Sequence, residues 1–565
     1  MRIDRPSPAL ALVLVLLSLV FPHSTWAVPL EGQTLLIAAP SPLAAQAGEK
    51  IALQGGNAVD VAVTVALALA VTSPYYAAFG GGGFALIQQS KGPQDRKKNP
   101  AIEVIDFRET APLATSAQFY TDREGRSSQD GGAAVAVPGV AAGLWALHRK
   151  HGRRPWHQLF REVLPLATQG FRVSGEWYRL TSANKARFNS AGKKYFFRDQ
   201  ADAVKPGLVL RQPQLAKFLR MYQQQGANAF YHGPVARDIV STVQKTGGVL
   251  SEKDLATYTV RWLQPLSVDF AGHTVHLMPP PSSGGVVIAA ALKLIELTHL
   301  KQYTPLSIDE LHVLAEIMKR SFRGRSQLGD PDFHQNPTPH LLSDDYLKPL
   351  AQTIDLRKTS AVSPLDDNSA NREDGNTTHF SVLDREGNAV AMTITLNGSY
   401  GSGVVTDVYG IALNNEMDDF TTRPGTTNQY ALMQGFANRV QPGKRPLSSM
   451  SPTLVSKDGQ IVMSLGAPGG PRIINGVLQA LYRTLVQGWD MDRAIQAPRI
   501  HHQFFPDVLF FDEALLQPAT LDELQKRGHK LQPTWIAKVY GVRKNTAGWL
   551  EAAFDARGEG GAAGH

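Results

Sequence analysis

Two adjacent threonines, Thr377 and Thr378, stand well inside the chain at the start of the strand-like run TTHFSVLD. A threonine hydroxyl is a weak nucleophile until a base takes its proton. If the bond between Asn376 and Thr377 is cut, Thr377 gains a free α-amine beside its hydroxyl, so that nucleophile and base share one residue. Such a residue suits an enzyme without cysteine, and this chain of 565 residues has none.

The elements after Thr377 predict how it is held. Runs 380–383 and 389–395 flank a short connection that contains glycine and asparagine, which is typical of a β-hairpin. Alternate residues of a strand share a face, so Thr393, Thr395 and Asn397 form a polar row that can orient a hydroxyl. Taken alone, the row is better explained as the solvent face of an ordinary hairpin, because threonine is a good strand residue.

Three later segments bring more polar groups. Run 414–420 is rich in acids and amides, run 445–452 brings paired serines, and run 466–470 brings the pair Gly469-Gly470 as a possible backbone nest. The acidic run lacks the spacing of a helix-loop-helix calcium site. A glycine pair can offer two N–H groups to an oxyanion, but more often forms only a tight turn. Each signal is weak alone.

Elements of the first half of the chain are marked by their ends. An apolar helix is expected at 61–72, capped by Asn57 or Asp60 and ended by Pro74. A second helix is expected at 308–321, with Ser307 and Glu310 in the spacing of a capping box.

The glycine run 80–83 formally satisfies a dinucleotide-binding pattern, but a helix precedes it and a strand at 84–87 follows, which is the reverse of the required order. The run is therefore expected to let the backbone pass close to another segment. A strand at 102–107 leads into Arg108, whose flat guanidinium can bind a carboxylate through two hydrogen bonds.

Together these motifs resemble the γ-glutamyltransferase (γ-glutamyltranspeptidase) family. The resemblance spans nearly the entire chain after residue 27 and rests on runs in the family's order: 55–60, 80–83, 106–109, 280–285, 377–382, 395–397, 415–420, 446–452 and 468–470. It implies an α+β fold, the four-layer αββα sandwich of N-terminal-nucleophile hydrolases. It also implies a precursor that cuts itself between Asn376 and Thr377 into a large subunit, 28–376, and a small subunit, 377–565, which stay together as a heterodimer.

The resemblance also implies the site. Thr377 is the nucleophile, Thr395 positions its hydroxyl, and the oxyanion hole is formed by Gly469 and Gly470. The α-carboxylate of a γ-glutamyl group is assigned to Arg108, Ser448 and Ser449, and its α-ammonium to Asn397, Glu416 and Asp419. Family members carry Glu or Gln at the position of Glu416, so the charged form here predicts a different pH response.

The implied substrates are glutathione and other γ-glutamyl donors, with water, amino acids or dipeptides as acceptors and no metal or organic cofactor. Segment 421–443, with Tyr430, resembles the lid loop of many transpeptidases, which favours small donors. A related cephalosporin acylase or γ-polyglutamate amidohydrolase with the same nucleophile is the alternative. An exported binding protein that kept the fold without activity is a rival from another class.

The composition and the terminal segments limit where the protein is located and which partners it has. Arg2 and Arg5 precede an apolar run at 9–20 and small residues before position 28, which predicts a signal peptide at 1–27 and export to the periplasm or the medium. The net charge of +8 is scattered in short groups, so no nucleic-acid partner is expected. The polar segment 355–375 predicts an exposed linker, and the tail 558–565 predicts a flexible end.

A last candidate, the pair His501-His502, is read as packing or surface residues. Adjacent residues on a strand point to opposite faces, so these two cannot easily ligate one metal together.

Overall fold

The computed structural model describes residues 29–90, 101–122, 124–198, 200–362, 377–423, 425–512 and 516–565. The predicted signal peptide, Asn376 and most of the predicted polar linker lie outside these residues.

Two seven-stranded antiparallel sheets form the centre of the molecule. The β10 sheet has the order β19 (Gly561–Gly564), β2 (Leu35–Ala39), β10 (Thr377–Asp384), β11 (Ala389–Thr395), β3 (Gly82–Gln88), β4 (Glu103–Phe107) and β7 (Arg261–Leu263). The β13 sheet has the order β1 (Leu30–Gly32), β18 (Leu550–Phe554), β17 (Tyr540–Lys544), β13 (Gln460–Gly466), β12 (Thr453–Lys457), β9 (His273–Leu277) and β8 (Leu266–Phe270). Two small sheets pair β5 (Phe171–Arg172) with β6 (Val209–Leu210), and β14 (Ile500–His501) with β15 (Leu509–Phe511) and β16 (Leu531–Pro533).

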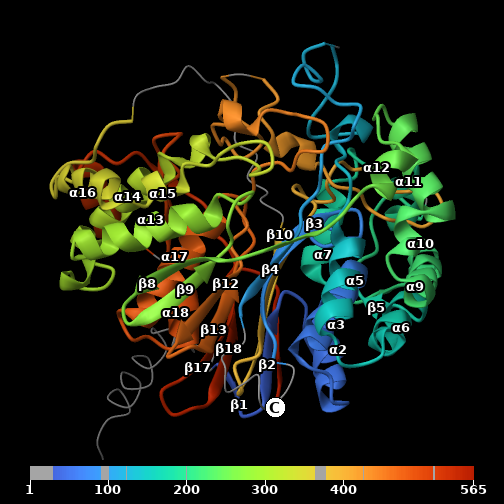
Figure 1. Ribbon diagram of the computed structural model, residues 1–565, viewed down its shortest axis with the longest axis horizontal. Helices are drawn as coiled ribbons and strands as arrows, with labels where there is room; N and C mark the ends of the chain where they lie inside the picture. The colour runs from blue at the N-terminus through green and yellow to red at the C-terminus, as the bar shows by residue number, and fades with distance from the viewer. Residues whose placement is uncertain are drawn as a thin grey trace, which may run out of the picture.

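Helices cover the outer face of each sheet, as Figure 1 shows with the sheets in the middle. The β10 sheet is covered by α2 (Pro42–Leu53), α3 (Ala58–Thr72) and α5 (Val140–His151), and the β13 sheet by α13 (Gly284–Leu297), α14 (Ile308–Phe322), α17 (Arg472–Leu485) and α18 (Met491–Gln496). The inner faces of the two sheets share one apolar cluster, to which Leu86 and Leu465 belong. The predicted αββα sandwich is confirmed.

Further helices extend these layers at the edges. They are α6 (Val163–Thr168), α7 (Gly175–Ala183), α8 (Ser190–Phe197), α9 (Pro213–Gln225), α10 (Asn228–Tyr231), α11 (Gly233–Lys245), α12 (Glu252–Ala256), α15 (Thr338–Leu341), α16 (Asp344–Gln352) and α19 (Pro518–Lys526). Among the described helices, none combines the length and the apolar character that a membrane span requires.

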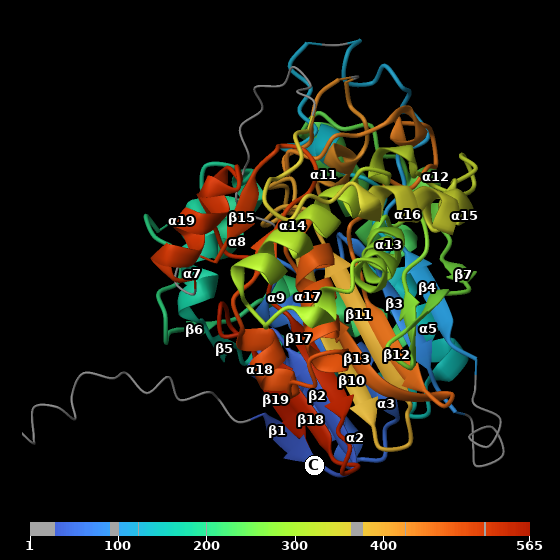
Figure 2. The ribbon, with the colours of Figure 1, turned by 90° about the vertical axis from the view of Figure 1, so that its left-hand side faces the viewer.

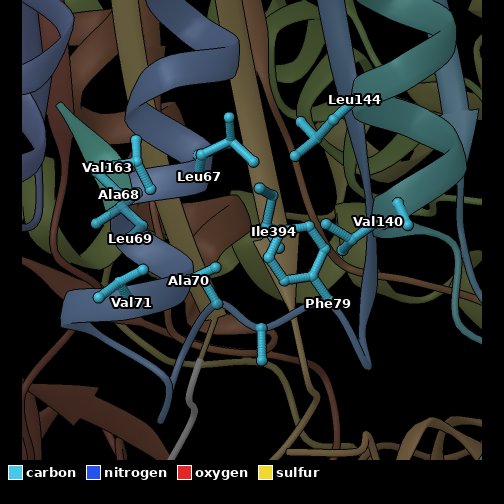
Figure 3. Packing of buried hydrophobic residues seen from close by; sticks show 14 of the residues in the cluster. Leu67, Ala68, Leu69, Ala70, Val71, Phe79, Val140, Leu144, Val163 and Ile394 are labelled. Carbon is cyan, nitrogen blue, oxygen red and sulfur yellow. The ribbon is translucent and has the colours of Figure 1, made fainter. Parts of the chain in front are cut away.

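The apolar helix α3 lies in the middle of its layer, and every one of its side chains is buried. Leu67 and its neighbours pack between β11, which contributes Ile394, and α5, which contributes Leu144 (Figure 3). Asn57 caps the helix by accepting hydrogen bonds from the amides of Val59 and Asp60, and the Asn57 amide in turn donates to the Asp60 carboxylate. Asn57 is thus the cap, and Asp60 completes a capping box.

The glycine run allows the close backbone approach that was expected. A Cβ on Gly81 would lie 1.9 Å from the carbonyl oxygen of Thr395, and one on Gly82 would lie 2.4 Å from the carboxylate of Glu109. Only glycine leaves room for the end of β11 and for Glu109 at the same place.

The capping box predicted for α14 is formed only in half. Ser307 accepts from the amide of Glu310 at 3.2 Å, but the Glu310 carboxylate accepts from the amide of Leu306 at 2.5 Å rather than from Ser307. Leu306 has a φ of 62°, which turns its amide toward the carboxylate in place of the amide of Ser307.

The prediction of a flexible tail is wrong. Residues Gly561–Gly564 form β19, which pairs with β2, and the carbonyl of His565 accepts hydrogen bonds from the amides of Thr34 and Leu35. The partner strand stands more than 500 positions earlier in the chain, so no local sequence signal could indicate this pairing.

We expect truncation after Gly560 to lower the free energy of unfolding by roughly 2 to 4 kcal/mol, at about 1 kcal/mol per ladder hydrogen bond. Urea unfolding followed by circular dichroism measures the change. An unfolding midpoint equal to that of the full chain would contradict the structural role of β19.

Candidate active site

The two threonines of the predicted catalytic pair face each other across the hairpin. Thr377 is the first residue of β10 and pairs in register with Thr395, the last residue of β11. Their hydroxyl oxygens are 3.1 Å apart, and the Thr395 oxygen also accepts from the amide of Asn397 at 2.8 Å. Thr395 is held by its own backbone neighbour and can therefore fix the rotamer of Thr377. Thr378 is buried on the opposite face of β10.

The polar row continues below the nucleophile. His379 is two residues after Thr377 in β10 and therefore lies on the same face of the strand. Its Nδ1 is 2.8 Å from the hydroxyl of Thr393, which is opposite it on β11. Burial lowers the pKa of His379 to about 3, so its imidazole is neutral at physiological pH. The hairpin thus presents neutral hydrogen-bonding groups toward the inside of the sandwich.

Gly469 and Gly470 connect β13 to the beginning of α17. Their φ angles are 132° and 57°, a region that favours glycine. Neither amide donates a hydrogen bond to another described residue, and the N-terminal end of the 14-residue helix α17 adds a partial positive charge. Two free N–H groups at a helix N-terminus have the properties of an oxyanion hole.

Arg108 follows β4 and lies at the centre of a buried charged cluster. Its guanidinium contacts the carboxylate of Glu416, lies 2.6 Å from Asp419 and 3.6 Å from Glu109, and is 1% exposed. Its Nε donates to the carbonyl of Pro446 at 3.2 Å, which ties the cluster to the serine loop. The sequence predicted that Arg108 binds the substrate carboxylate together with the serines, while the two acids bind the substrate ammonium. In the structure, Arg108 forms ion pairs with both acids directly.

The loop with Ser448 and Ser449 is held by the serine that precedes α13. Ser283 donates from its hydroxyl to the carbonyl of Ser448 at 2.7 Å, and its amide donates to the same carbonyl at 2.8 Å. The serines before α13 therefore act as loop hydroxyls, and they hold the loop that carries Ser448.

Asn397 and Tyr430 both line the site, and a hydrogen bond joins them. Asn397 has a φ of 70°, which asparagine tolerates, and its side chain donates to the carbonyl of Asn415 at 3.0 Å. The Tyr430 hydroxyl donates to the carbonyl of Asn397 at 2.7 Å. A Cβ on Gly470 would lie 3.0 Å from the ring of Tyr430, so the ring lies against Gly470.

One pocket unites nearly all the predicted residues. It is lined by ten of the eleven, Arg108, Thr377, Thr395, Asn397, Glu416, Asp419, Tyr430, Ser448, Ser449 and Gly470, while Gly469 adjoins it through Gly470. Leu432, Met450 and Ile473 supply apolar walls that sequence reasoning did not identify. With Tyr430 in place the cavity measures only about 20 Å³, so entry of a substrate requires the lid or the charged side chains to move.

Two carboxyls of the cluster, those of Glu416 and Glu109, have raised pKa values. Burial raises the pKa of Glu416 well above its ordinary value, because the attraction of Arg108 offsets only part of the desolvation and Glu109 opposes ionisation. Burial raises the pKa of Glu109 from its ordinary 4.5 to about 7, against the attraction of Arg108. Neither carboxylate oxygen of Glu109 has a hydrogen-bond partner among the described residues.

Glu109 had no predicted role. Its only sequence signal was its place directly after Arg108, and its burial depends on the room left by Gly82. Asn428, from the lid segment, was also missed; its amide donates to Asp419 at 3.1 Å and helps to hold that carboxylate.

We expect Glu109→Gln to reduce the pH dependence of stability. A carboxyl whose pKa is raised on folding contributes stability below its unfolded value near 4.5, and this stability is lost as the pH rises through about 7. The thermal midpoint of the wild type should therefore fall more between pH 5 and 8 than that of the variant. Glu252→Gln, on the exposed start of α12, serves as control, and an unchanged pH slope in Glu109→Gln would contradict the assignment.

The adjacent histidines do not form a metal site. His501 is bonded to Asn475 and Gln503, whereas His502 is bonded to Asp507 at 3.2 Å. Within the described part of the chain no group of three or more metal-ligating side chains occurs. Both histidines are buried, so of the two roles foreseen for them packing is the one observed.

The fold and the site define a class. Two antiparallel sheets between helical layers, with a threonine at the start of a central strand and a glycine turn in the same pocket, are the architecture of N-terminal-nucleophile hydrolases. The chain belongs to the γ-glutamyltranspeptidase family, whose model, described as Gamma-glutamyltranspeptidase, matches residues 44–565.

Individual relatives agree with this assignment. The chain is 39% identical to the glutathione hydrolase proenzyme of Escherichia coli (strain K12), over 89% of this chain and 87% of that protein. It is 38% identical to the protein of the same name from Pseudomonas sp. (strain A14), over 90% and 88%. The structure of γ-glutamyltranspeptidase from Pseudomonas nitroreducens complexed with L-DON matches with a TM-score of 0.53 at 32% identity, over 58% of this chain and 96% of that one.

A cephalosporin acylase from Bacillus halodurans shares the fold. Its structure matches with a TM-score of 0.83 over 97% of this chain and 98% of that chain, at 24% identity. At that identity the likeness shows the architecture and not the substrate.

Proposed function

We propose that the protein is an exported γ-glutamyltransferase and glutathione hydrolase that uses Thr377 as its nucleophile. The observation that carries the proposal is the 3.1 Å contact between the hydroxyls of Thr377 and Thr395 in the same pocket as Arg108 and its acids. The names of the relatives support glutathione as a substrate.

Maturation would begin with attack of the Thr377 hydroxyl on the carbonyl of Asn376. The bond between the Asn376 carbonyl and the Thr377 nitrogen would break as the ester forms, which frees the α-amine of Thr377. Water would then hydrolyse the ester, which restores the Thr377 hydroxyl, gives Asn376 a carboxylate and leaves subunits 28–376 and 377–565. The arrangement of strands supports a lasting heterodimer, because β10 lies between β2 of the large subunit and β11 of the small one. Separating the subunits would break the hydrogen bonds between β10 and β2 inside the β10 sheet.

Turnover would repeat the same attack on the γ-glutamyl amide. The freed α-amine, with an ordinary pKa of about 7.7 to 8.0, would take the hydroxyl proton and pass it to the leaving amine. Gly469 and Gly470 would donate their amides to the oxyanion, and the γ-glutamyl ester on Thr377 would then pass to water, an amino acid or a dipeptide.

The γ-glutamyl group would be recognised by the charged cluster, where its own charged groups would take the place of the contacts between Arg108 and the acids. A γ-glutamyl group carries an α-carboxylate and an α-ammonium, so it can replace the contacts between Arg108 and the acids charge for charge. The carboxylate would bind Arg108 with Ser448 and Ser449, and the ammonium would bind Glu416, Asp419 and Asn397. Neutral or singly charged ligands would leave a buried charge unpaired, which disfavours them strongly.

The lid favours small donors. Tyr430 is 7% exposed and lies against Gly470, and bulky polymers or β-lactam side chains would need a wider entrance. The alternative function, an acylase or γ-polyglutamate amidohydrolase with the same nucleophile, therefore fits the pocket less well. No metal or organic cofactor enters the mechanism.

Export by the predicted signal peptide 1–27 completes the proposal and places the enzyme in the periplasm or the medium, where extracellular glutathione and peptides would be its donors and acceptors.

The test is release of p-nitroaniline from γ-glutamyl-p-nitroanilide by purified protein, with and without glycylglycine. We expect release without acceptor and faster release with it. Cleavage of a glutaryl or cephalosporin amide without γ-glutamyl turnover would favour the acylase. A protein that stays one chain and turns over neither substrate would favour the binding-protein reading.

A further inference from the structure

A basic lobe stands apart from the active site. It spans residues 171–211 and contains β5, α7, α8 and β6, which Figure 2 shows together on one side of the molecule. The lobe has nine Lys and Arg residues and three Asp and Glu residues, a net charge of +6 out of +8 for the whole chain. None of its residues lines the pocket of Thr377.

Most of this charge is exposed and unpaired. Seven basic side chains of the lobe are exposed: Arg172, Arg179, Lys193, Lys194, Arg198, Lys205 and Arg211. Whereas Arg187 pairs with Asp130 at 2.5 Å, none of the seven has a carboxylate within 4.0 Å among the residues that the structure describes. Unpaired cations on one surface attract an anionic partner.

Hydrogen bonds join several of the segments that carry these basic side chains. Arg198, at the end of α8, donates to the carbonyl of Arg211 at 3.2 Å, and Arg172 donates to the carbonyl of Gly207 at 2.7 Å. β5 and β6 pair in register, with Arg172 opposite Val209. Lys193 and Lys194 lie on the last turns of α8, next to Arg198.

An apolar tip lies within this surface. Leu208 is 57% exposed and Val209 is 38% exposed, and they follow Lys205 and precede Arg211. Exposed aliphatic side chains beside unpaired cations are of no use to a hydrophilic polyanion, which offers no apolar surface. The interface of a lipid bilayer offers both anionic headgroups and hydrocarbon.

A neighbouring cavity also favours lipid. It measures about 700 Å³ and is lined by apolar side chains that include Leu43, Leu166, Phe171 and Phe554. Arg172 belongs to the lining and to the lobe, and Glu559 is the acidic side chain in it. Hydrocarbon could enter this cavity while its headgroup stays near Arg172.

We propose that the basic lobe docks the protein on an anionic lipid surface, with the seven basic side chains at the headgroups and Leu208 and Val209 in the interfacial layer. Each cation near such a surface strengthens binding by roughly fivefold, and salt weakens it. Binding is therefore reversible and depends on ionic strength, and it leaves the pocket of Thr377 free.

Co-sedimentation of the full-length protein with vesicles tests the proposal. We expect binding to vesicles of phosphatidylglycerol and phosphatidylcholine in equal parts, release by about 0.5 M salt, and no binding to phosphatidylcholine alone. The combined variant Lys193→Glu, Lys194→Glu, Lys205→Glu should lower the partition coefficient by at least roughly a hundredfold. Leu208→Ser, which keeps the charge, should lower it by several-fold.

A matched control carries the same net charge as the lobe variant. It combines Lys253→Glu, Lys301→Glu and Lys457→Glu, at exposed positions outside the lobe, and should bind within about twofold of the wild type. Release of p-nitroaniline in solution should be unchanged in all of these variants.

Three results would overturn the proposal. The first is that the protein does not bind the anionic vesicles, whether or not it binds a soluble polyanion such as heparin at the same salt concentration. The second is equal loss of binding in the lobe and control variants, which would trace binding to net charge. The third is wild-type binding by Leu208→Ser, which would exclude the apolar tip.

Discussion

Thr377→Ala is expected to remain one uncut chain and to lose γ-glutamyl turnover by at least about 10⁴-fold. The variant lacks the hydroxyl that lies 3.1 Å from that of Thr395, so neither the bond before residue 377 nor a substrate amide can be attacked. A denaturing gel measures the cut, and release of p-nitroaniline measures turnover.

Two variants separate loss of the hydroxyl from loss of structure. Thr377→Ser keeps a hydroxyl and should still be cut, although more slowly. Thr378→Val changes the neighbour on the opposite face, whose hydroxyl has no hydrogen-bond partner among the described residues, and it should be cut and active. A cut or active Thr377→Ala would refute the assignment of the nucleophile.

Arg108→Ala is expected to lower kcat/KM for γ-glutamyl substrates by at least about 10³-fold. The substitution removes the group that would bind the α-carboxylate, and it leaves Glu416 and Asp419 buried without their cation. Breaking a buried ion pair in this way costs about 3 to 5 kcal/mol, so the free energy of unfolding should fall as well. Steady-state kinetics and urea unfolding measure the two effects.

Arg108→Lys tests the planar geometry of the guanidinium separately from its charge. Lysine keeps the cation near the acids but cannot bind a carboxylate through two parallel hydrogen bonds. We expect near-normal stability with a KM raised by at least about tenfold. Arg179→Ala, on the exposed face of α7, is the control. A KM for Arg108→Lys equal to that of the wild type would contradict the role of Arg108 in recognition.

The hairpin and the site residues could be predicted from the sequence because their signals are local. The turn at 384–388 fixes the register of β10 and β11, and that register places Thr395 beside Thr377. The family resemblance supplied the remaining positions, and ten of the eleven predicted site residues line one pocket. Local pattern and motif order thus sufficed for the centre of the fold.

The sequence did not indicate features that depend on distant partners. The pairing of β19 with β2, the burial of Glu109 against Gly82, and the direct pairing of Arg108 with Glu416 all join segments far apart in the chain. The raised pKa values of Glu109 and Glu416 follow from this packing, because desolvation is the largest cause of both shifts. Only the assembled structure shows these contacts.

The measurement that tests the central claim most directly is the N-terminal sequence of the smaller fragment of the purified protein. The mechanism requires the α-amine and the hydroxyl on the same residue, so the fragment must begin with Thr377, followed by Thr378 and His379. A fragment that begins at any other residue, or a fully active protein that remains uncut, would contradict the mechanism.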